Sequence, residues 1–329
     1  MHAWLCENPV GVDALQWKEL PTPQPGAGEV LVAIHAASLN FPDLLIVRNL
    51  YQMKPPLPFV PGAEFAGVVQ AVGADVTQLR PGQRVACLAG TGGFGTHTLA
   101  PATLCMPLPN DFPFVDAAAF IMTYATSHHA LVDRAQLRAG ETVLVLGAAG
   151  GVGTAAIQIA KAVGAQVIAA ASSTEKCALC RTLGADATID YSHEDLRVRL
   201  KELTHGKGPD VVYDPVGGTL TEPAFRSIAW RGRYLVVGFA SSPAIPALPL
   251  NLPLLKGASI VGVFWGDFAR REPQAQAAMM AELARWYAQG KVKPVIDSTP
   301  PMTQLKAAYA RMESRRVLGK LVLVNEYAA

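Results

Sequence analysis

The stretch Val143–Ser173 reads VLVLGAAGGVGTAAIQIAKAVGAQVIAAASS and predicts a strand, a tight turn, a helix and a second strand. An apolar run is followed by clustered glycines, and apolar residues then recur with the helical period. A glycine-rich turn between a strand and a helix is typical of dinucleotide binding, because the helix amino terminus offers free N–H groups to a pyrophosphate. We expect cofactor contacts from Ala149, Gly150, Gly151, Val152 and Gly153.

Two glycines of this turn have distinct expected roles. Gly150 lets the backbone approach the pyrophosphate, and Gly153 lets the helix pack closely on the strand. The first position of the hexad is Ala148 rather than glycine. A tight turn that binds no ligand is therefore the alternative interpretation.

The end of the second strand predicts which nicotinamide cofactor is bound. Sites that prefer NAD place an Asp or Glu about 20 residues after the turn, where it accepts hydrogen bonds from the ribose 2'-hydroxyl. Here the strand ends in Ser172 and Ser173, with Lys176 just beyond. Two hydroxyls and an ammonium favour a 2'-phosphate, so we expect NADPH, with contacts from Ser172 and Lys176. Alternatively, Lys176 lies on a solvated helix face.

The remainder of the chain divides into segments with different patterns of predicted secondary structure. Residues 1–120 contain short β-rich segments broken by proline and glycine, which indicates an all-β module. In residues 121–265 strands alternate with helices, which is typical of βαβ units on a parallel sheet. Residues 266–329 hold two helical patterns and a final strand that we expect to complete the first module. The predicted fold class is α/β, a doubly wound parallel sheet with a β-rich domain.

Composition excludes several classes of function. A net charge of +2 without any block of Lys or Arg excludes a nucleic-acid surface. The uncharged run Thr142–Ala160 is interrupted by glycines, so no membrane span is expected. The amino terminus lacks a secretory pattern, and the five cysteines are scattered, which favours a cytoplasmic protein. Cys177 and Cys180 have CxxC spacing but fit an amphipathic helix as structural residues.

Several motifs together resemble the medium-chain dehydrogenase/reductase superfamily, most closely its zinc-free quinone oxidoreductase branch. They are PFVPGAEFAGVVQAVG, GAAGGVG, DVVYDPVGG and GKLVL, and the resemblance runs from end to end. It implies a GroES-like domain, completed by the carboxyl-terminal segment, together with a Rossmann domain, and an active site between the two. It also implies a homodimer.

The ligand positions of the zinc-dependent members are altered in this sequence. The segment AASLNFPDL has no cysteine, and Ala63 replaces the histidine of the Gly-His-Glu stretch. The region between Cys87 and Cys105 lacks the four cysteines of a structural zinc lobe. We therefore expect no metal. Oxidation of an alcohol needs a Lewis acid, whereas reduction of a quinone or an activated C=C needs an oriented nicotinamide and a proton source.

The resemblance also suggests residues for the reaction. Asn40 and Tyr51 would lie near the nicotinamide, where Asn40 could instead cap a turn and Tyr51 could be a pocket wall rather than a proton donor. Thr126 resembles a threonine beside the nicotinamide ring. Five further residues would line the cofactor or substrate: Tyr191, Gly238, Phe239, Phe264 and Trp265.

The function expected from these residues is an NADPH-dependent oxidoreductase that acts on a quinone or a conjugated carbonyl without a metal. An enoyl thioester reductase is the alternative enzymatic function. A non-catalytic NADPH-binding protein is the alternative from another class.

Overall fold

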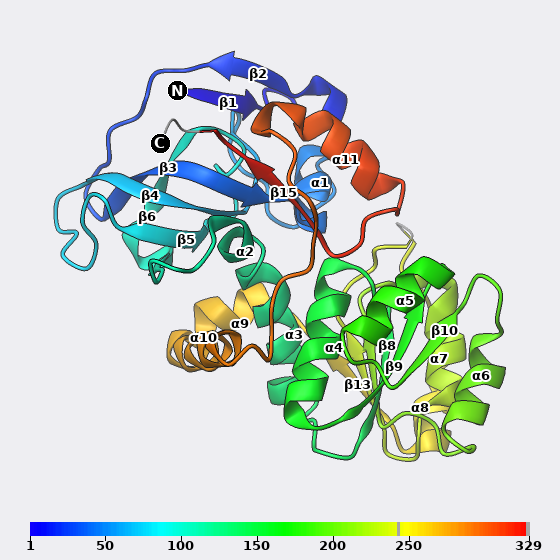
Figure 1. Ribbon diagram of the computed structural model, residues 1–329. Helices are drawn as coiled ribbons and strands as arrows, with labels where there is room; N and C mark the ends of the chain where they lie inside the picture. The colour runs from blue at the N-terminus through cyan, green and yellow to red at the C-terminus, as the bar shows by residue number, and fades with distance from the viewer. Residues whose placement is uncertain (242–243, 327–329) are drawn as a thin grey trace. The chain divides into compact units, whose positions relative to one another are not determined.

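The computed structural model describes residues 1–241 and 244–326, and these form two compact units (Figure 1). The first unit contains residues 1–122 and the described chain from Ile296 onward, and the second contains Thr123–Val295. Segment 266–295 was expected to complete the first module. In the structure it belongs to the second unit.

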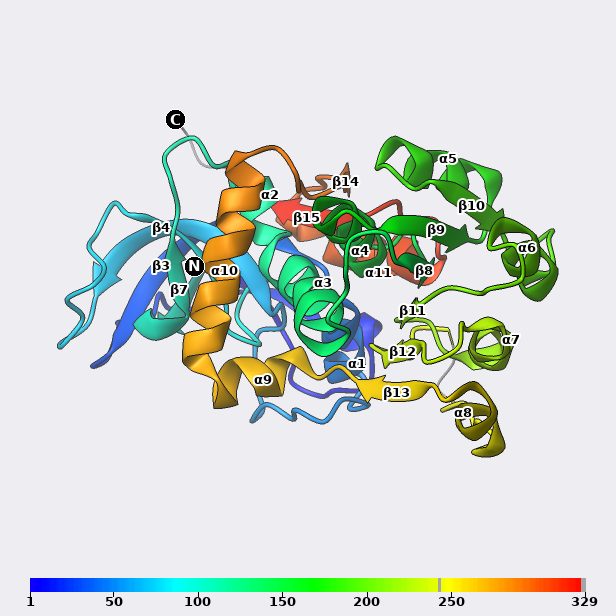
Figure 2. The same cartoon turned by 90° about the horizontal axis from the view of Figure 1, so that it is seen from below.

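The reason for this difference is the packing of two helices, α9 (Trp265–Arg271) and α10 (Pro273–Ala288). Figure 2 shows the chain passing from strand β13 into α9 and then into α10. The indole Nε1 of Trp265 donates a 2.8 Å hydrogen bond to Gln276 Oε1, which joins the two helices. The Nε2 atom of His128 lies 3.0 Å from Glu282 Oε2, which joins α10 to the rest of the second unit. Such contacts between distant segments have no local sequence signature.

The first unit is built on antiparallel β-structure. Its seven-stranded sheet has the order β14-β15-β3-β4-β5-β7, and β6 also pairs with β3. The carboxyl-terminal strand β15 pairs with β3 in the register Val322↔Ser38, so the end of the chain completes this sheet. The strands of the unit are β1 (His2–Leu5), β2 (Gln16–Glu19), β3 (Glu29–Ser38), β4 (Glu64–Val72), β5 (Arg84–Leu88), β6 (His97–Pro101), β7 (Cys105–Pro107), β14 (Ile296–Ser298) and β15 (Lys320–Val324).

Three helices accompany this sheet, and two of them contribute residues to its core. Phe65, Phe94 and Tyr309 are among its largest fully buried side chains. The helices are α1 (Phe41–Val47), α2 (Phe114–Ala118) and α11 (Leu305–Glu313), with single helical turns η1 (Val12–Ala14), η2 (Ala102–Leu104) and η6 (Met302–Gln304).

The second unit is a six-stranded sheet in which every pairing is parallel, with the order β10-β9-β8-β11-β12-β13. This is the doubly wound order, in which the strand sequence reverses between β8 and β11. The near-continuous apolar runs of the central strands reflect burial on both faces. The strands are β8 (Thr142–Leu146), β9 (Gln166–Ala171), β10 (Ala187–Asp190), β11 (Val211–Asp214), β12 (Arg233–Val236) and β13 (Ser259–Gly262).

Helices connect these parallel strands, and α4 and α5 lie in front of β8 and β9 in Figure 1. Before β8, one helical segment combines η3 (Ile121–Ala125), α3 (Thr126–His128) and η4 (His129–Arg134), with π-type hydrogen bonding in its first and last parts. The other helices are α4 (Gly151–Val163), α5 (Thr174–Thr182), α6 (Leu196–Leu203), η5 (Gly218–Leu220), α7 (Thr221–Ser227) and α8 (Asn251–Lys256). Among the described residues, no helix has the length and apolarity that crossing a bilayer requires.

Candidate functional site

The glycine-rich turn lies where β8 passes into α4, and two of its glycines are required by close contacts. Gly147 has φ +58°, and a Cβ atom on it would lie 2.6 Å from Val216 Cγ2. A Cβ on Gly153 would lie 2.5 Å from the carbonyl oxygen of Gly147 and 2.7 Å from Ala148 Cα. Gly150 is different, because its Cβ would meet only the Gly147 oxygen, at 3.4 Å. The fold itself therefore accounts for Gly147 and Gly153 but leaves Gly150 without a packing reason.

The turn after β11 touches the same edge of the sheet and is held by Asp214. Its Oδ1 accepts hydrogen bonds of 2.8 Å from the backbone N–H groups of Val216 and Gly217, and Tyr234 donates to its Oδ2. A Cβ on Gly217 would lie 2.9 Å from a ring atom of Phe239. The glycine turn, the Asp214 turn and the predicted residues Gly238 and Phe239 thus meet at the carboxyl ends of β8, β11 and β12, where ligands bind in folds of this kind.

The predicted phosphate-binding residues come together at the ends of β9 and β10. The Nζ atom of Lys176 donates a 2.9 Å hydrogen bond to Ser172 Oγ. The N–H of Tyr191 donates to the carbonyl oxygen of Ala171, and the hydroxyl of Ser192 donates to that of Ser172. The structure therefore brings Ser172, Lys176 and Tyr191 to one place, with the lysine turned back toward the strand end.

Thr126 begins α3, and its neighbour Ser127 ties that helix to the glycine turn. The Ser127 hydroxyl donates to the carbonyl oxygen of Val152 at 3.0 Å. It also lies 2.9 Å from the hydroxyl of Tyr213, which must be the donor because Ser127 has a single hydroxyl proton. Ser127 is fully buried and was missed by sequence reasoning, since a lone serine in an apolar helix carries no pattern.

The two predicted aromatic residues after β13 differ in their surroundings. Phe264 is 62% exposed, whereas Trp265 is 6% exposed and its only side-chain hydrogen-bond donor is engaged by Gln276. Phe264 is thus free to contact a ligand, and Trp265 holds α9 against α10. A role for either residue in cofactor binding stays a prediction.

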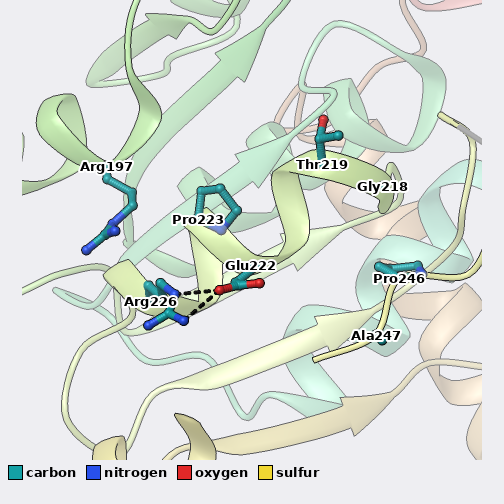
Figure 3. Close-up of a pocket in the computed structure, with 8 residues that line it drawn as sticks. All are labelled: Arg197, Gly218, Thr219, Glu222, Pro223, Arg226, Pro246 and Ala247. Atoms are coloured by element: carbon teal, nitrogen blue, oxygen red, sulfur yellow. Dashed lines mark hydrogen bonds and ion pairs between the residues drawn. The ribbon is translucent and has the colours of Figure 1, made fainter. Parts of the chain in front are cut away.

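A pocket of about 380 Å³ lies elsewhere in the second unit, beside α6 and α7 (Figure 3). Arg226 crosses one turn of α7 to pair with Glu222, with its Nε 2.7 Å from Oε1. None of the residues predicted from the sequence to bind the cofactor is part of its lining. The lining residues are Arg197, Gly218, Thr219, Glu222, Pro223, Arg226, Pro246 and Ala247.

In the first unit, Asn40 lies in a buried polar cluster. Its Nδ2 donates to Glu64 Oε2 at 3.0 Å, and its Oδ1 accepts a 2.5 Å hydrogen bond from Lys320 Nζ. The Ser38 hydroxyl donates to the same Glu64 oxygen at 2.8 Å, and the N–H of Met122 donates to Glu64 Oε1. Both polar ends of the Asn40 side chain are therefore engaged within the unit, by a cation on one side and an anion on the other.

Asp43 joins the two segments that flank this cluster. Its Oδ2 accepts from the N–H of Asn40 at 2.8 Å, and its Oδ1 accepts from the N–H of Ala63 at 2.9 Å. Burial raises the pKa of Asp43 to about 7, against the opposing effects of these two donors and of Lys320. Asp43 thus serves as a clamp between the start of α1 and the Pro61–Glu64 segment.

Tyr51 follows α1 and packs, half-buried, against the core of the first unit. Burial, and then the carboxylate of Asp43, raise the pKa of its hydroxyl above the ordinary value. The phenol therefore keeps its proton throughout the neutral range and can act as a hydrogen-bond donor. Whether it does so in a reaction stays a prediction.

The residues of this cluster do not fit a zinc ion. Zinc takes thiolate, imidazole and carboxylate ligands, and Ala63 offers none of them. Both Asp43 oxygens accept backbone N–H groups, and the ammonium of Lys320 already lies 3.8 Å from Glu64 Oε2. Within the described residues no group of three or more His, Cys, Asp or Glu is arranged to hold a metal. Lys320 lies in the GKLVL motif, and no local pattern indicates its role because its partners Leu39, Asn40 and Glu64 lie far away in the sequence.

The residues of the second unit do fit a nicotinamide dinucleotide. The α4 helix begins at Gly151 directly after the glycine turn, so its first N–H groups are available to a pyrophosphate. The side chains at the ends of β9 and β10 supply hydroxyl and ammonium donors. No carboxylate ends β9.

Comparison with known proteins agrees with this arrangement. Residues 26–110 match the alcohol dehydrogenase GroES-like domain, and residues 151–285 match the zinc-binding dehydrogenase family. The chain is 37% identical to the quinone oxidoreductase-like protein 2 homolog of Nematostella vectensis, covering 98% of this chain and 88% of that protein. It is 38% identical to a quinone oxidoreductase of Pseudomonas aeruginosa, covering 95% and 96%.

A mycobacterial protein solved in complex with NADPH shares the fold, with a TM-score of 0.91, 31% identity, and coverage of 99% of this chain and all of that one. The GroES-like and Rossmann architecture expected from the sequence is thereby confirmed. The chain therefore belongs to the medium-chain dehydrogenase/reductase superfamily, as an oxidoreductase of the quinone oxidoreductase-like group that uses a nicotinamide cofactor.

Proposed function

We propose that this protein is an NADPH-dependent reductase of quinones or of activated C=C bonds in conjugated carbonyls, and that it works without a metal ion. The bound nicotinamide supplies a hydride. The residues of the chain bind and orient the cofactor, and they supply a proton or a hydrogen bond to the reduced acceptor. The proposal includes a homodimer in the cytoplasm.

The choice of NADPH rests on the contact between Lys176 and Ser172. The lysine is held beside the end of β9, and Ser172 rather than an acidic residue directly follows that strand. An ammonium and a hydroxyl together can make charge-assisted hydrogen bonds to a phosphate. The similar mycobacterial protein, solved with NADPH, supports the same choice.

The choice of acceptor rests on the buried cluster around Glu64. A Lewis-acid metal is one means of stabilising the alkoxide when an alcohol is oxidised, and the cluster holds an ammonium beside Glu64 and lacks a set of metal ligands. Reduction of a quinone or a conjugated carbonyl has no such need. Tyr51 would supply the hydrogen bond or proton for a conjugated carbonyl, and Asn40 and Thr126 would orient the reactants. The names of the relatives support a quinone as one acceptor.

A turnover assay tests the proposal. Purified protein is mixed with NADPH or NADH and with an o-quinone, a p-quinone, an enone or an enoyl thioester, and the nicotinamide absorbance is followed. We expect turnover with NADPH and a quinone or an enone. Turnover confined to the enoyl thioester would replace the proposed acceptor, and tight NADPH binding without any turnover would indicate a non-catalytic binding protein.

A further inference from the structure

We propose that Lys320 is a positioning residue, whose ammonium compensates the buried Glu64 carboxylate and fixes the orientation of the Asn40 amide in the first unit. We refer to Ser38, Asn40, Asp43, Glu64 and Lys320 as the lysine cluster. The inference about the reaction rests on the proposed function, whereas the inference about the cluster does not.

The ammonium of Lys320 joins β15 to two distant segments of the chain. It donates to Asn40 Oδ1 at 2.5 Å and to the carbonyl oxygen of Leu39 at 2.8 Å, and it lies 3.8 Å from Glu64 Oε2. An ammonium has three donors, so two hydrogen bonds and one facing carboxylate satisfy it. Lys320 is 5% exposed and Glu64 is fully buried. Such a geometry identifies a built cation site rather than a chance surface contact.

The charges of the cluster determine which way the Asn40 amide points. Its oxygen faces the Lys320 ammonium, and its nitrogen faces the Glu64 carboxylate at 3.0 Å. A flipped amide would place N–H groups against the ammonium and an oxygen against the carboxylate. Lys320 therefore holds Asn40 in one orientation at the start of α1, the helix that leads toward Tyr51.

The same arrangement explains how the Glu64 carboxylate can stay buried. A carboxylate without a compensating charge is costly in a protein interior. Here Lys320, the first residue of β15, supplies a compensating positive charge 3.8 Å from Glu64 Oε2. Because the Lys320 ammonium is buried and donates to groups of the first unit, we expect it to act through Asn40 and Glu64.

Four variants test this inference: Lys320→Met, Glu64→Gln, the double variant Lys320→Met/Glu64→Gln, and Lys18→Met. The last is the matched control, because Lys18 pairs with Glu7 at 2.9 Å on the surface of the same unit. The thermal unfolding midpoint is measured for each. We expect Lys320→Met to lower Tm by roughly 5 to 15 °C, because removing one partner leaves a buried charge unpaired. Lys18→Met should change Tm by about 2 °C or less.

The double variant separates a charge effect from a packing effect. It removes both charges, so we expect a higher Tm than for Lys320→Met alone. A Tm loss equal to the sum of the two single losses would overturn the cation-site inference. So would a Tm for Lys320→Met equal to that of Lys18→Met. Neither result depends on enzymatic activity.

Kinetics test the positioning role, with wild-type turnover of NADPH and a quinone or an enone as the reference. We expect Lys320→Met to lower kcat at least about tenfold while KM for NADPH changes less than about twofold, the pattern of a lost orientation effect. A wild-type kcat in a Lys320→Met protein of lowered Tm would restrict Lys320 to stability and overturn its role in the reaction. An inactive wild type would instead refute the proposed function, and the Tm series would still decide the cluster.

Discussion

The Nζ atom of Lys176 donates a hydrogen bond to Ser172 Oγ, four residues earlier in the chain, at 2.9 Å. Ser173, between them, caps α5 by accepting from the Lys176 N–H at 3.3 Å. The cap and the side-chain contact together hold the ammonium at the end of β9. The chain itself therefore holds the lysine in place, and such preorganisation would lower the entropy cost of the 2'-phosphate contact proposed above.

Lys176→Ala is expected to weaken NADPH binding by about 10- to 100-fold and to leave NADH binding within about twofold. Only NADPH carries the 2'-phosphate that the ammonium would contact. Dissociation constants from titration calorimetry check this, with Lys207→Ala as an exposed lysine control in the same unit. Equal losses for the two cofactors would place Lys176 away from the phosphate.

We expect an added methyl group to have different effects at Gly153 and at Gly150. Gly153→Ala would bring its Cβ to 2.5 Å from the Gly147 oxygen, so we expect a loss of about 1 to 3 kcal/mol in the free energy of unfolding. Gly150→Ala meets only an ordinary contact at 3.4 Å, so we expect near wild-type stability with weakened cofactor binding. Urea unfolding and cofactor titration of both variants check this pair. Normal NADPH affinity in Gly150→Ala would contradict a role in pyrophosphate approach.

The activity is expected to persist in a chelator, and purified protein is expected to contain no stoichiometric zinc. The physical reason is that Ala63 offers no ligand and Lys320 occupies the charge position beside Glu64. Elemental analysis and assays before and after prolonged EDTA treatment check this. About one zinc per chain, with activity lost on its removal and regained on its return, would show the proposal to be wrong.

Tyr51→Phe is expected to lower kcat about 10²- to 10³-fold with an enone, to leave KM nearly unchanged, and to have little effect with a p-quinone. Reduction of a conjugated carbonyl leaves an enolate that needs a hydrogen-bond donor, whereas a reduced quinone can take its proton from water. Steady-state kinetics with both acceptors check this.

Tyr309→Phe is the matched control for Tyr51→Phe, because the Tyr309 hydroxyl is buried in the same unit without a hydrogen-bond partner among the described residues. We expect it to retain full activity. Unchanged turnover of both acceptors by Tyr51→Phe would mean that Tyr51 only forms a wall of the pocket. Orientation of the reactants by Asn40 and Thr126 would then be the main contribution of the protein to catalysis.

Asp43 is expected to make stability depend on pH. Its pKa is raised to about 7 in the folded protein, chiefly by burial, from about 4 in an unfolded chain. The folded state holds this proton more tightly, so the Asp43 contribution to stability is fully present below about pH 4 and is lost as the pH rises through about 7. In Asp43→Asn that slope should disappear, although the variant is less stable overall because a backbone N–H loses its acceptor.

Urea unfolding at several pH values between 4 and 8 compares the two proteins. The free energy of unfolding of the wild type should fall relative to that of Asp43→Asn across this range. A difference that is constant with pH would mean that Asp43 stays ionised in the folded state.

The sequence by itself determined the features that rest on local pattern. The apolar run, the glycines and the helical period around Gly150 predict a strand, a turn and a helix, and these are β8, the turn and α4. The Ser172–Lys176 contact joins residues four positions apart, across the Ser173 cap that begins α5, so it too depends on a local stretch of sequence. The sequence motifs were sufficient to identify the family, and the comparisons with known proteins confirm it.

Only the tertiary structure decided the features that join distant segments. Lys320 and Asn40 are 280 positions apart, and the sequence around either residue gives no sign that the two are in contact. The assignment of 266–295 to the second unit likewise depends on contacts such as His128 with Glu282, 154 positions away. Periodicity records which face of an element is buried, but not which element buries it. The orientation of the Asn40 amide, set by an ammonium from the last strand, is therefore a property that the folded chain alone reveals.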